Sequence, residues 1–169
     1  IGIYGIGEML WTIESTGKQE LLSSVTVSVA RTMSAFRELG KTFKGMTMGS
    51  VLGYFVGILT AAGATPGSLM AYGLAKTMDK EPESFGKGNI KGIVAPESAN
   101  NAASTGSMLP MLTLGIPGSP TTAILLGGMV MWGLEPGPLL FVEHKEFVWP
   151  LIASLYAANL FALIINIAF

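Results

Sequence analysis

The chain has 169 residues, of which 50% are hydrophobic and 12% are charged, and its formal net charge is −1. Soluble domains carry about a quarter charged residues, so this composition, with a mean hydropathy of +0.54, indicates an integral membrane protein. The balanced charge argues against a nucleic-acid partner, which needs a clustered basic surface, and the absence of cysteine excludes disulfides and thiolate metal sites.

The first part of the chain is expected to lead into a membrane region. Residues 1–13 are Gly-rich and apolar and are expected to be the end of a membrane helix, and residues 14–44 a cytoplasmic connection. The membrane-embedded region is then residues 45–169. Because the chain starts at Ile1 and stops at Phe169 within an apolar run, we expect one incomplete domain of a longer protein.

Three charge-free stretches organise the membrane region: residues 45–75, 98–134 and 147–169. A helix needs about 20 apolar residues to cross a bilayer, so the third stretch predicts one crossing. The other two are longer and contain Pro and Gly near their centres, at 63–67 and 115–120, where each is expected to split. Such breaks are typical of discontinuous or re-entrant helices in transporters; the alternative is two Pro kinks used only for packing.

Basic residues flank the first stretch on both sides. Lys and Arg favour the cytoplasmic face, so residues 45–75 are expected to enter and return as a hairpin that turns near 63–66. Residues 76–91 then form a cytoplasmic loop, and residues 135–146 lie on the opposite face. The flanking basic residues are Arg31, Arg37, Lys41, Lys44, Lys76, Lys80, Lys87 and Lys91.

A glycine recurs every four residues at the start of the first stretch, at Gly45, Gly49, Gly53 and Gly57. On a helix this spacing gives one smooth face that lets another backbone approach closely. The pattern predicts helix packing and indicates no chemistry.

Two hydroxyl-proline pairs, Thr65–Pro66 and Ser119–Pro120, follow the breaks. Ser and Thr cap helix starts, and Pro is well tolerated at the first helical position, so each pair predicts that a new helix begins there. The positive end of such a helix can bind an anion, and Thr121 and Thr122 add hydroxyls beside the second pair. The alternative is an ordinary capped helix at the membrane surface.

Polar side chains stand at the mouth of the second stretch, at Glu97, Asn100 and Asn101. Polar groups in lipid usually mark a pathway or a paired interior site, and amide oxygens can coordinate Na⁺. Alternatively, Glu97 lies at the interface and Asn100 caps the helix. Asn159 and Asn166 share one face of the last helix and are interpreted as polar contacts between helices.

The inventory of reactive residues argues against an enzyme. With one His and one Asp, His144 and Asp79, the chain has no HExxH motif and no aspartyl dyad. Gly86-Lys87 lacks the other residues of a phosphate-binding loop, and no nucleophile elbow surrounds any Ser.

Three motifs resemble one known family, the large membrane subunit (TctA-type permease) of bacterial tripartite tricarboxylate transporters. They are residues 85–101 (Phe-Gly-Lys-Gly, then Gly-Ile-Val-Ala-Pro-Glu-Ser-Ala-Asn-Asn), 109–118 (Leu-Pro-Met-Leu-Thr-Leu-Gly-Ile-Pro-Gly) and 133–141 (Gly-Leu-Glu-Pro-Gly-Pro-Leu-Leu-Phe). The resemblance covers essentially the whole chain. One departure is Thr-Ala-Ala-Gly at 60–63, where the family has a Pro-Gly-Ala-Gly turn.

The resemblance implies a secondary active carrier that takes up citrate or related organic carboxylates across the bacterial inner membrane, driven by Na⁺ or H⁺ and without a cofactor. It implies two partners, a small membrane subunit and a periplasmic substrate-binding protein, and a chain that is roughly the second half of the permease. The alternatives are a non-transporting membrane scaffold, which would need no break in 98–134, and an anion channel.

The candidate site residues combine both lines of reasoning. Ion coupling is assigned to Glu97, Asn100 and Thr113, with a possible Na⁺ near the Asn pair. Substrate binding is assigned to Asn100, Asn101, Gly118, Ser119, Thr121 and Thr122.

Overall fold

The computed structural model describes residues 29–59 and 63–168, and every regular element within these ranges is helical. This agrees with the all-α prediction, whereas the expected helix end at 1–13, residues 14–28 and the family departure at 60–62 lie outside the described residues. The elements are α2 (Val29–Ile58), α3 (Ala64–Met78), the 3₁₀-helix η1 (Pro82–Ser84), α4 (Lys91–Gly106), α5 (Met108–Leu114), α6 (Pro120–Met131), α7 (Leu140–Glu143) and α8 (Lys145–Ala168).

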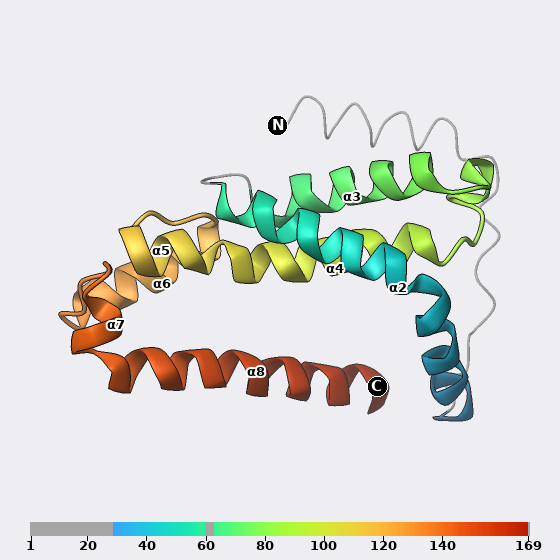
Figure 1. The fold of residues 1–169 in the computed structure, drawn as a ribbon. Helices are drawn as coiled ribbons and strands as arrows, with labels where there is room; N and C mark the ends of the chain where they lie inside the picture. The colour runs from blue at the N-terminus through green and yellow to red at the C-terminus, as the bar shows by residue number, and fades with distance from the viewer. Residues whose placement is uncertain (1–28, 60–62, 169) are drawn as a thin grey trace, which may run out of the picture.

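Helices α2, α3 and α4 all pack against one another, with α2 in front of α4 in the view of Figure 1, and this group of three is called the helical layer below. α2 and α4 run in the same direction, and α3, which connects them, runs in the opposite direction. The end of α3 therefore lies beside the start of α4, where Ala75 of α3, Ala95 of α4 and Met48 of α2 belong to one cluster. The two ends of the stretch 45–75 therefore lie at the same end of the layer. α2 already begins at Val29, within the expected connection 14–44.

The glycine face of α2 packs directly on α4, as its spacing predicts. A Cβ added at Gly49, Gly53 or Gly57 would collide with the backbone carbonyl of a residue on α4. Because these positions carry no side chain, the two backbones approach closely along three turns. The opposing residues are Ala95, Ala99 and Ala103, which are buried and share the same four-residue spacing.

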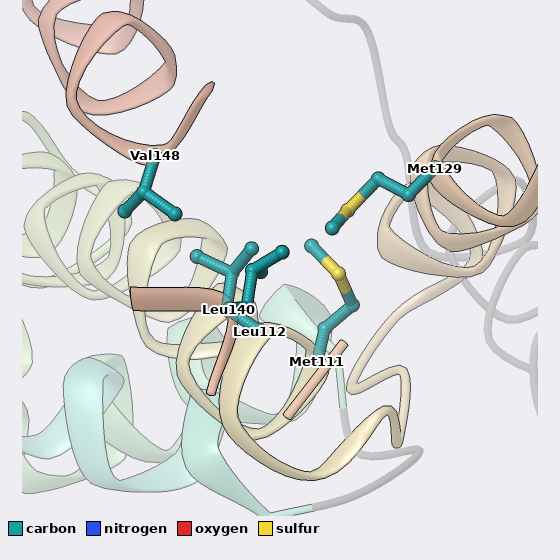
Figure 2. Close-up of a cluster of buried hydrophobic side chains, with 5 residues drawn as sticks. All are labelled: Met111, Leu112, Met129, Leu140 and Val148. Carbon is teal, nitrogen blue, oxygen red and sulfur yellow. The ribbon is translucent and has the colours of Figure 1, made fainter. Parts of the chain in front are cut away.

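A second cluster joins the C-terminal helices (Figure 2). It contains two methionines from α5 and α6 that point toward one another, and branched side chains from α5, α7 and α8. Burial of this kind stabilises by about 25 cal/mol per Å² of apolar surface, and it holds the short helices α5, α6 and α7 against the start of α8. The members are Met111, Leu112, Met129, Leu140 and Val148.

Helix α8 returns beneath the layer toward the end from which α4 starts (Figure 1). Its segment Lys145–Ile165 is the one helix among the described residues that is long and apolar enough to cross a membrane. Only 6% of that window is buried inside the structure, so its apolar surface is not that of a soluble core helix. The prediction of a helix over 147–169 agrees with α8.

Two local expectations are corrected by the structure. Thr65 does not cap a helix: α3 already begins at Ala64, and Gly63, at φ +68°, occupies the cap position without a side-chain hydrogen bond. The alternative in which Asn100 caps a helix is wrong, because α4 starts at Lys91, continues through Pro96 and contains Asn100 in its interior. Glu97 and the Asn pair therefore lie inside a helix rather than at its mouth.

Candidate functional site at a broken helix

The second apolar stretch is broken between α5 and α6, at residues 115–119. α5 ends at Leu114, and Gly115 adopts the left-handed conformation at φ +68° that glycine favours. The Gly115 N–H donates to the carbonyl of Met111 at 3.1 Å, and the Ile116 N–H donates to that of Pro110 at 3.3 Å. These bonds close the helix end, so the break is a defined turn.

The next helix starts at the position that the Ser-Pro pair predicts. The Thr122 N–H donates to Ser119 Oγ at 3.2 Å, and the Ser119 N–H donates to Thr122 Oγ1 at 2.9 Å. These reciprocal bonds form a capping box, with Pro120 in the first turn of α6. The prediction that α6 begins with Ser119 as its cap is confirmed.

The break is pressed against the helical layer at Gly118. This residue is buried, and a Cβ there would lie 2.9 Å from Ser107 Cβ and 3.0 Å from the carbonyl oxygen of Gly57. Only glycine fits at this distance without movement of its neighbours. The start of α6 is therefore held inside the protein, next to the last glycine of the α2 face.

A third hydroxyl, which the sequence analysis missed, joins the site at Ser107. Its side chain is 1% exposed, and its Oγ donates to the carbonyl of Ser104 at 2.8 Å and lies 3.5 Å from Ser119 Oγ. Ser107 follows the last residue of α4 as its C-cap, and no motif in the sequence marks it. Its role becomes visible only when the chain brings residues twelve apart together.

The hydroxyls at the start of α6 are unequal in exposure. Thr122 is 4% exposed, and its Oγ1 donates to the carbonyl of Ser119 at 2.9 Å, whereas the Thr121 side chain is exposed. The positive end of a helix and clustered hydroxyls are groups that can hydrogen-bond an anion such as a carboxylate. Because Ser119 and Thr122 are already bonded to each other, an anion there would compete with the capping box.

The polar residues of α4 form a separate group. Glu97, Asn100 and Asn101 are all exposed, and the Asn101 amide donates to the carbonyl of Glu97 in the same helix at 2.9 Å. Within the described ranges, no hydrogen bond joins the Asn pair to the break. Asn100 lies inside α4, so it does not cap that helix.

Thr113 also bonds within its own helix, from its hydroxyl to the carbonyl of Leu109 at 2.7 Å. The structure therefore brings Gly118, Ser119 and Thr122 together, and it joins neither Thr113 nor the residues of α4 to them by a hydrogen bond. Across the described residues, no group of three His, Asp or Glu side chains could hold a metal ion.

A mostly apolar cleft of 320 Å³ is lined by residues of α2, α4, α5, α7 and α8. Its polar members include Tyr54, Thr105, Tyr156 and Asn159, of which only Asn159 was singled out from the sequence. The Asn159 amide donates to the carbonyl of Leu155 in its own helix at 2.9 Å, so the expected contact between helices is not what it makes. The expected partner on its face, Asn166, has no described side chain.

Fold and break together define an all-helical protein with a discontinuous apolar segment, the construction that transporters use to place helix ends at a site. The chain belongs to the tripartite tricarboxylate transporter TctA family, whose family model matches residues 1–169. This confirms the resemblance seen in the sequence motifs. TctA is a family of membrane transporters whose systems are tripartite.

Two curated relatives come from Agrobacterium vitis. One is an uncharacterized 52.8 kDa protein in the TAR-I ttuC′ 3′ region, 33% identical over 99% of this chain and 33% of its own length. The other is an uncharacterized protein in the TAR-II ttuC′ 3′ region, 39% identical over 68% of this chain and 48% of its own length. The chain thus spans about a third to a half of these relatives. No solved structure matches it.

Proposed function

We propose that this chain is part of the large permease subunit of a secondary active transporter, which takes up tricarboxylates or related citrate-like carboxylates across the bacterial inner membrane. A Na⁺ or H⁺ gradient drives uptake. A periplasmic substrate-binding protein delivers the carboxylate, and a small membrane subunit completes the complex. Membership in the TctA family supports the transport role and the partner subunits.

One observation supports a location for the substrate site. The capped start of α6 is held inside the protein, where Gly118 packs against α2 and the end of α4. Irregular backbone at membrane depth requires cover by protein or contact with water. In the proposed mechanism, Ser119, Thr121 and Thr122 hydrogen-bond a substrate carboxylate at the positive end of α6. Gly118 contributes by letting the break pack closely against Ser107 and Gly57, which holds the start of α6 in place.

The polar group on α4 is assigned to ion coupling. Oxygen ligands of the kind that a hard cation prefers are supplied by Glu97, Asn100 and Asn101. Thr113 on α5 is proposed to add a further oxygen for the coupling ion. Asn100 and Asn101 also face the substrate in this proposal. Asn101 lies about 9 Å along α4 from Ser107, at 1.5 Å per residue, and Ser107 Oγ lies 3.5 Å from Ser119 Oγ at the break. A citrate-sized anion and its ion can bridge this span.

The scaffold alternative expects an unbroken helix over 98–134, and the structure contains a defined break at 115–119. The close Gly–Ala packing of α2 on α4 is what a scaffold would use, but it leaves the polar break unexplained. We therefore favour the carrier over the scaffold and over an anion channel.

The test is uptake of labelled citrate by cells that carry the full-length permease and both partners, with and without a Na⁺ gradient. Ser119→Asp keeps a side chain that caps helices well but places a negative charge where the substrate carboxylate is proposed to bind. We expect uptake to fall at least about tenfold, because like charges a few ångströms apart repel by several kcal/mol at an effective dielectric constant near 20. Asn101→Ala is expected to abolish uptake through the ion site.

The matched control is Ser154→Ala on α8, whose exposed hydroxyl bonds only to the carbonyl of Leu151 in its own helix. It is expected to transport normally. Normal uptake by Ser119→Asp at equal membrane levels would reject the site at α6 while keeping the carrier. Failure of the unaltered permease to move any carboxylate in a panel would reject the carrier in favour of the scaffold.

A further inference from the structure

We propose that one face of the α2–α3 pair binds an anionic phospholipid, with its phosphate in a charged cavity beside Lys44 and an acyl chain in the apolar groove that continues from it. This inference concerns a surface away from the break between α5 and α6. It does not depend on the transported substrate.

The charged cavity lies where the connection between α3 and α4 meets α2. It has a volume of 470 Å³ and is lined by the lysines Lys44, Lys80 and Lys91, with Asp79 and Glu81 as its acidic members. Three cations from three segments therefore converge on one hollow. Basic cavities between membrane helices on the cytoplasmic side are typical binding sites for lipid headgroups.

The ion pair in this cavity leaves Lys44 without a partner among the described residues. Lys91 Nζ lies 2.6 Å from Asp79 Oδ2, and the Asp79 side chain is only 7% exposed, so these two charges neutralise each other. Lys44 is exposed and belongs to neither of the two ion pairs of the described residues. An anion entering the cavity thus meets Lys44 and Lys80 opposed only by Glu81.

An apolar groove of 650 Å³ begins at the same lysine. It is lined by α2 and α3 and shares Lys44, Met48 and Met78 with the charged cavity. Phe55 at 65% and Val51 at 59% exposure lie along it. The groove is thus continuous with the cavity, and the only charged side chain that lines it stands at its cavity end.

The length of the groove and the charge of the cavity together indicate which kind of molecule binds there. From Lys44 to Phe55 the groove follows eleven residues of α2, about 16 Å at 1.5 Å per residue, close to one leaflet of a hydrocarbon core that is about 30 Å thick. A tricarboxylate has the charge but no apolar tail, and a partner helix has an apolar face but no anionic head at this point. A phospholipid with a negative phosphate has both.

The experiment measures lipid binding to the purified full-length permease by native mass spectrometry. Phosphatidylglycerol is titrated against phosphatidylcholine with the same acyl chains, and inorganic phosphate is a third arm. We expect phosphatidylglycerol to bind preferentially and Lys44→Gln to weaken it about fivefold, since one lysine near a membrane surface contributes about that factor. Lys87→Gln is the charge control, because Lys87 is exposed in the connection between α3 and α4 but does not line the cavity.

A second pair of variants tests the groove. Val51→Trp fills it and is expected to remove the bound lipid, whereas Leu69→Trp, on an exposed site of α3 outside the groove, is expected to bind as the unaltered protein does. Elution as a single folded species in gel filtration is required of each variant. The proposal is overturned if the two lipids bind equally, if Lys44→Gln binds phosphatidylglycerol as the unaltered permease does, or if free phosphate binds as tightly as lipid. It is also overturned if chemical cross-linking of the full-length permease places another of its segments in the groove. Because no transport is measured, the result is independent of the carrier proposal.

Discussion

At the scale of single residues, Ser119 was predictable and Ser107 was not. A Ser before a Pro after an apolar break is a local signal for a helix start, and the capping box forms there. Thr65 carries the same local signal, yet Gly63 takes the cap position of α3. The residue type thus predicts which positions can cap a helix, while the path of the preceding turn determines which of these positions does so.

Ser119→Ala is expected to destabilise the permease by about 1 kcal/mol, the usual effect of losing an N-cap side chain. In this variant the Thr122 N–H loses its acceptor, Ser119 Oγ, whereas the backbone N–H of residue 119 keeps Thr122 Oγ1 as its acceptor. Thermal unfolding in detergent measures the change against Ser154→Ala as the control. An unchanged midpoint in Ser119→Ala would show that the capping box does not hold the start of α6.

Acid should weaken the connection between α3 and α4 through Asp79. The hydrogen bond from Lys91, followed by that from the Glu81 N–H, holds the pKa of the Asp79 carboxyl below its usual value. A carboxyl with a lowered folded pKa stabilises the fold above its unfolded pKa, and this contribution is lost as pH falls through the folded pKa.

We therefore expect Asp79→Asn to be less stable than the unaltered permease at neutral pH. The difference should shrink steadily as pH is lowered below about 4, the ordinary pKa of an aspartate. Unfolding midpoints from pH 7 to pH 3 measure it, with Glu83→Gln, an exposed carboxyl on η1, as the control. A difference that grows toward low pH would contradict the assignment.

At the scale of elements, the glycine face of α2 could be predicted, but its partner could not. Four glycines at four-residue spacing predict close packing, and no local feature says which helix supplies the other surface. The answer is Ala95, Ala99 and Ala103 of α4, whose spacing matches but whose small side chains are common in any membrane helix. The break at 115–119 was likewise predictable, because Pro and Gly act on the backbone locally.

Gly53→Ala is expected to disrupt this packing. The new Cβ would lie 2.5 Å from Ala99 Cα, so the helices must separate, and overpacking of this kind costs about 1–3 kcal/mol. Gly73→Ala on α3 is the matched control, because nothing lies within 4 Å of its Cβ position and Ala is favoured over Gly in a helix by about 1 kcal/mol.

Unfolding midpoints and the yield of folded permease measure both variants. We expect Gly53→Ala to fall below the unaltered protein and Gly73→Ala to equal or exceed it. Equal stability of the two would mean that α2 and α4 do not touch along this face in the membrane.

At the scale of the whole molecule, composition predicted an all-helical membrane protein, and the motifs predicted the family. The placement of α8 beneath the layer was not predictable, because the cluster that holds it draws on α5, α6, α7 and α8 (Figure 2). The candidate site was predicted in part: Gly118, Ser119 and Thr122 meet at the break, whereas Asn100 and Asn101 bind no side chain there. The direction in which Asn100 and Asn101 point depends on how α4 packs against α2 and α3, which the local sequence does not specify.

The chain orientation can be tested with introduced cysteines, because these 169 residues contain none and any elsewhere in the full-length permease can be replaced by serine. The α3–α4 connection and α7 lie at opposite ends of the structure (Figure 1), and the charge bias predicts the first end to be cytoplasmic. A cysteine at Lys87 should react with an impermeant maleimide only in opened membranes, and one at Glu135 should react in intact cells whose outer membrane is permeable. The reverse labelling pattern would contradict the predicted orientation.

The matched four-residue spacing on α2 and α4 also restricts how these helices can move. The two surfaces fit each other where a glycine lies against the backbone of an alanine, as Gly53 lies against Ala99, and a small slide along the axis moves each glycine away from the backbone that it accommodates. The next register that restores the fit is one repeat away, about 6 Å at 1.5 Å per residue. We therefore expect any sliding along this seam to occur in steps of one repeat, and smaller motions to carry α2 and α4 together.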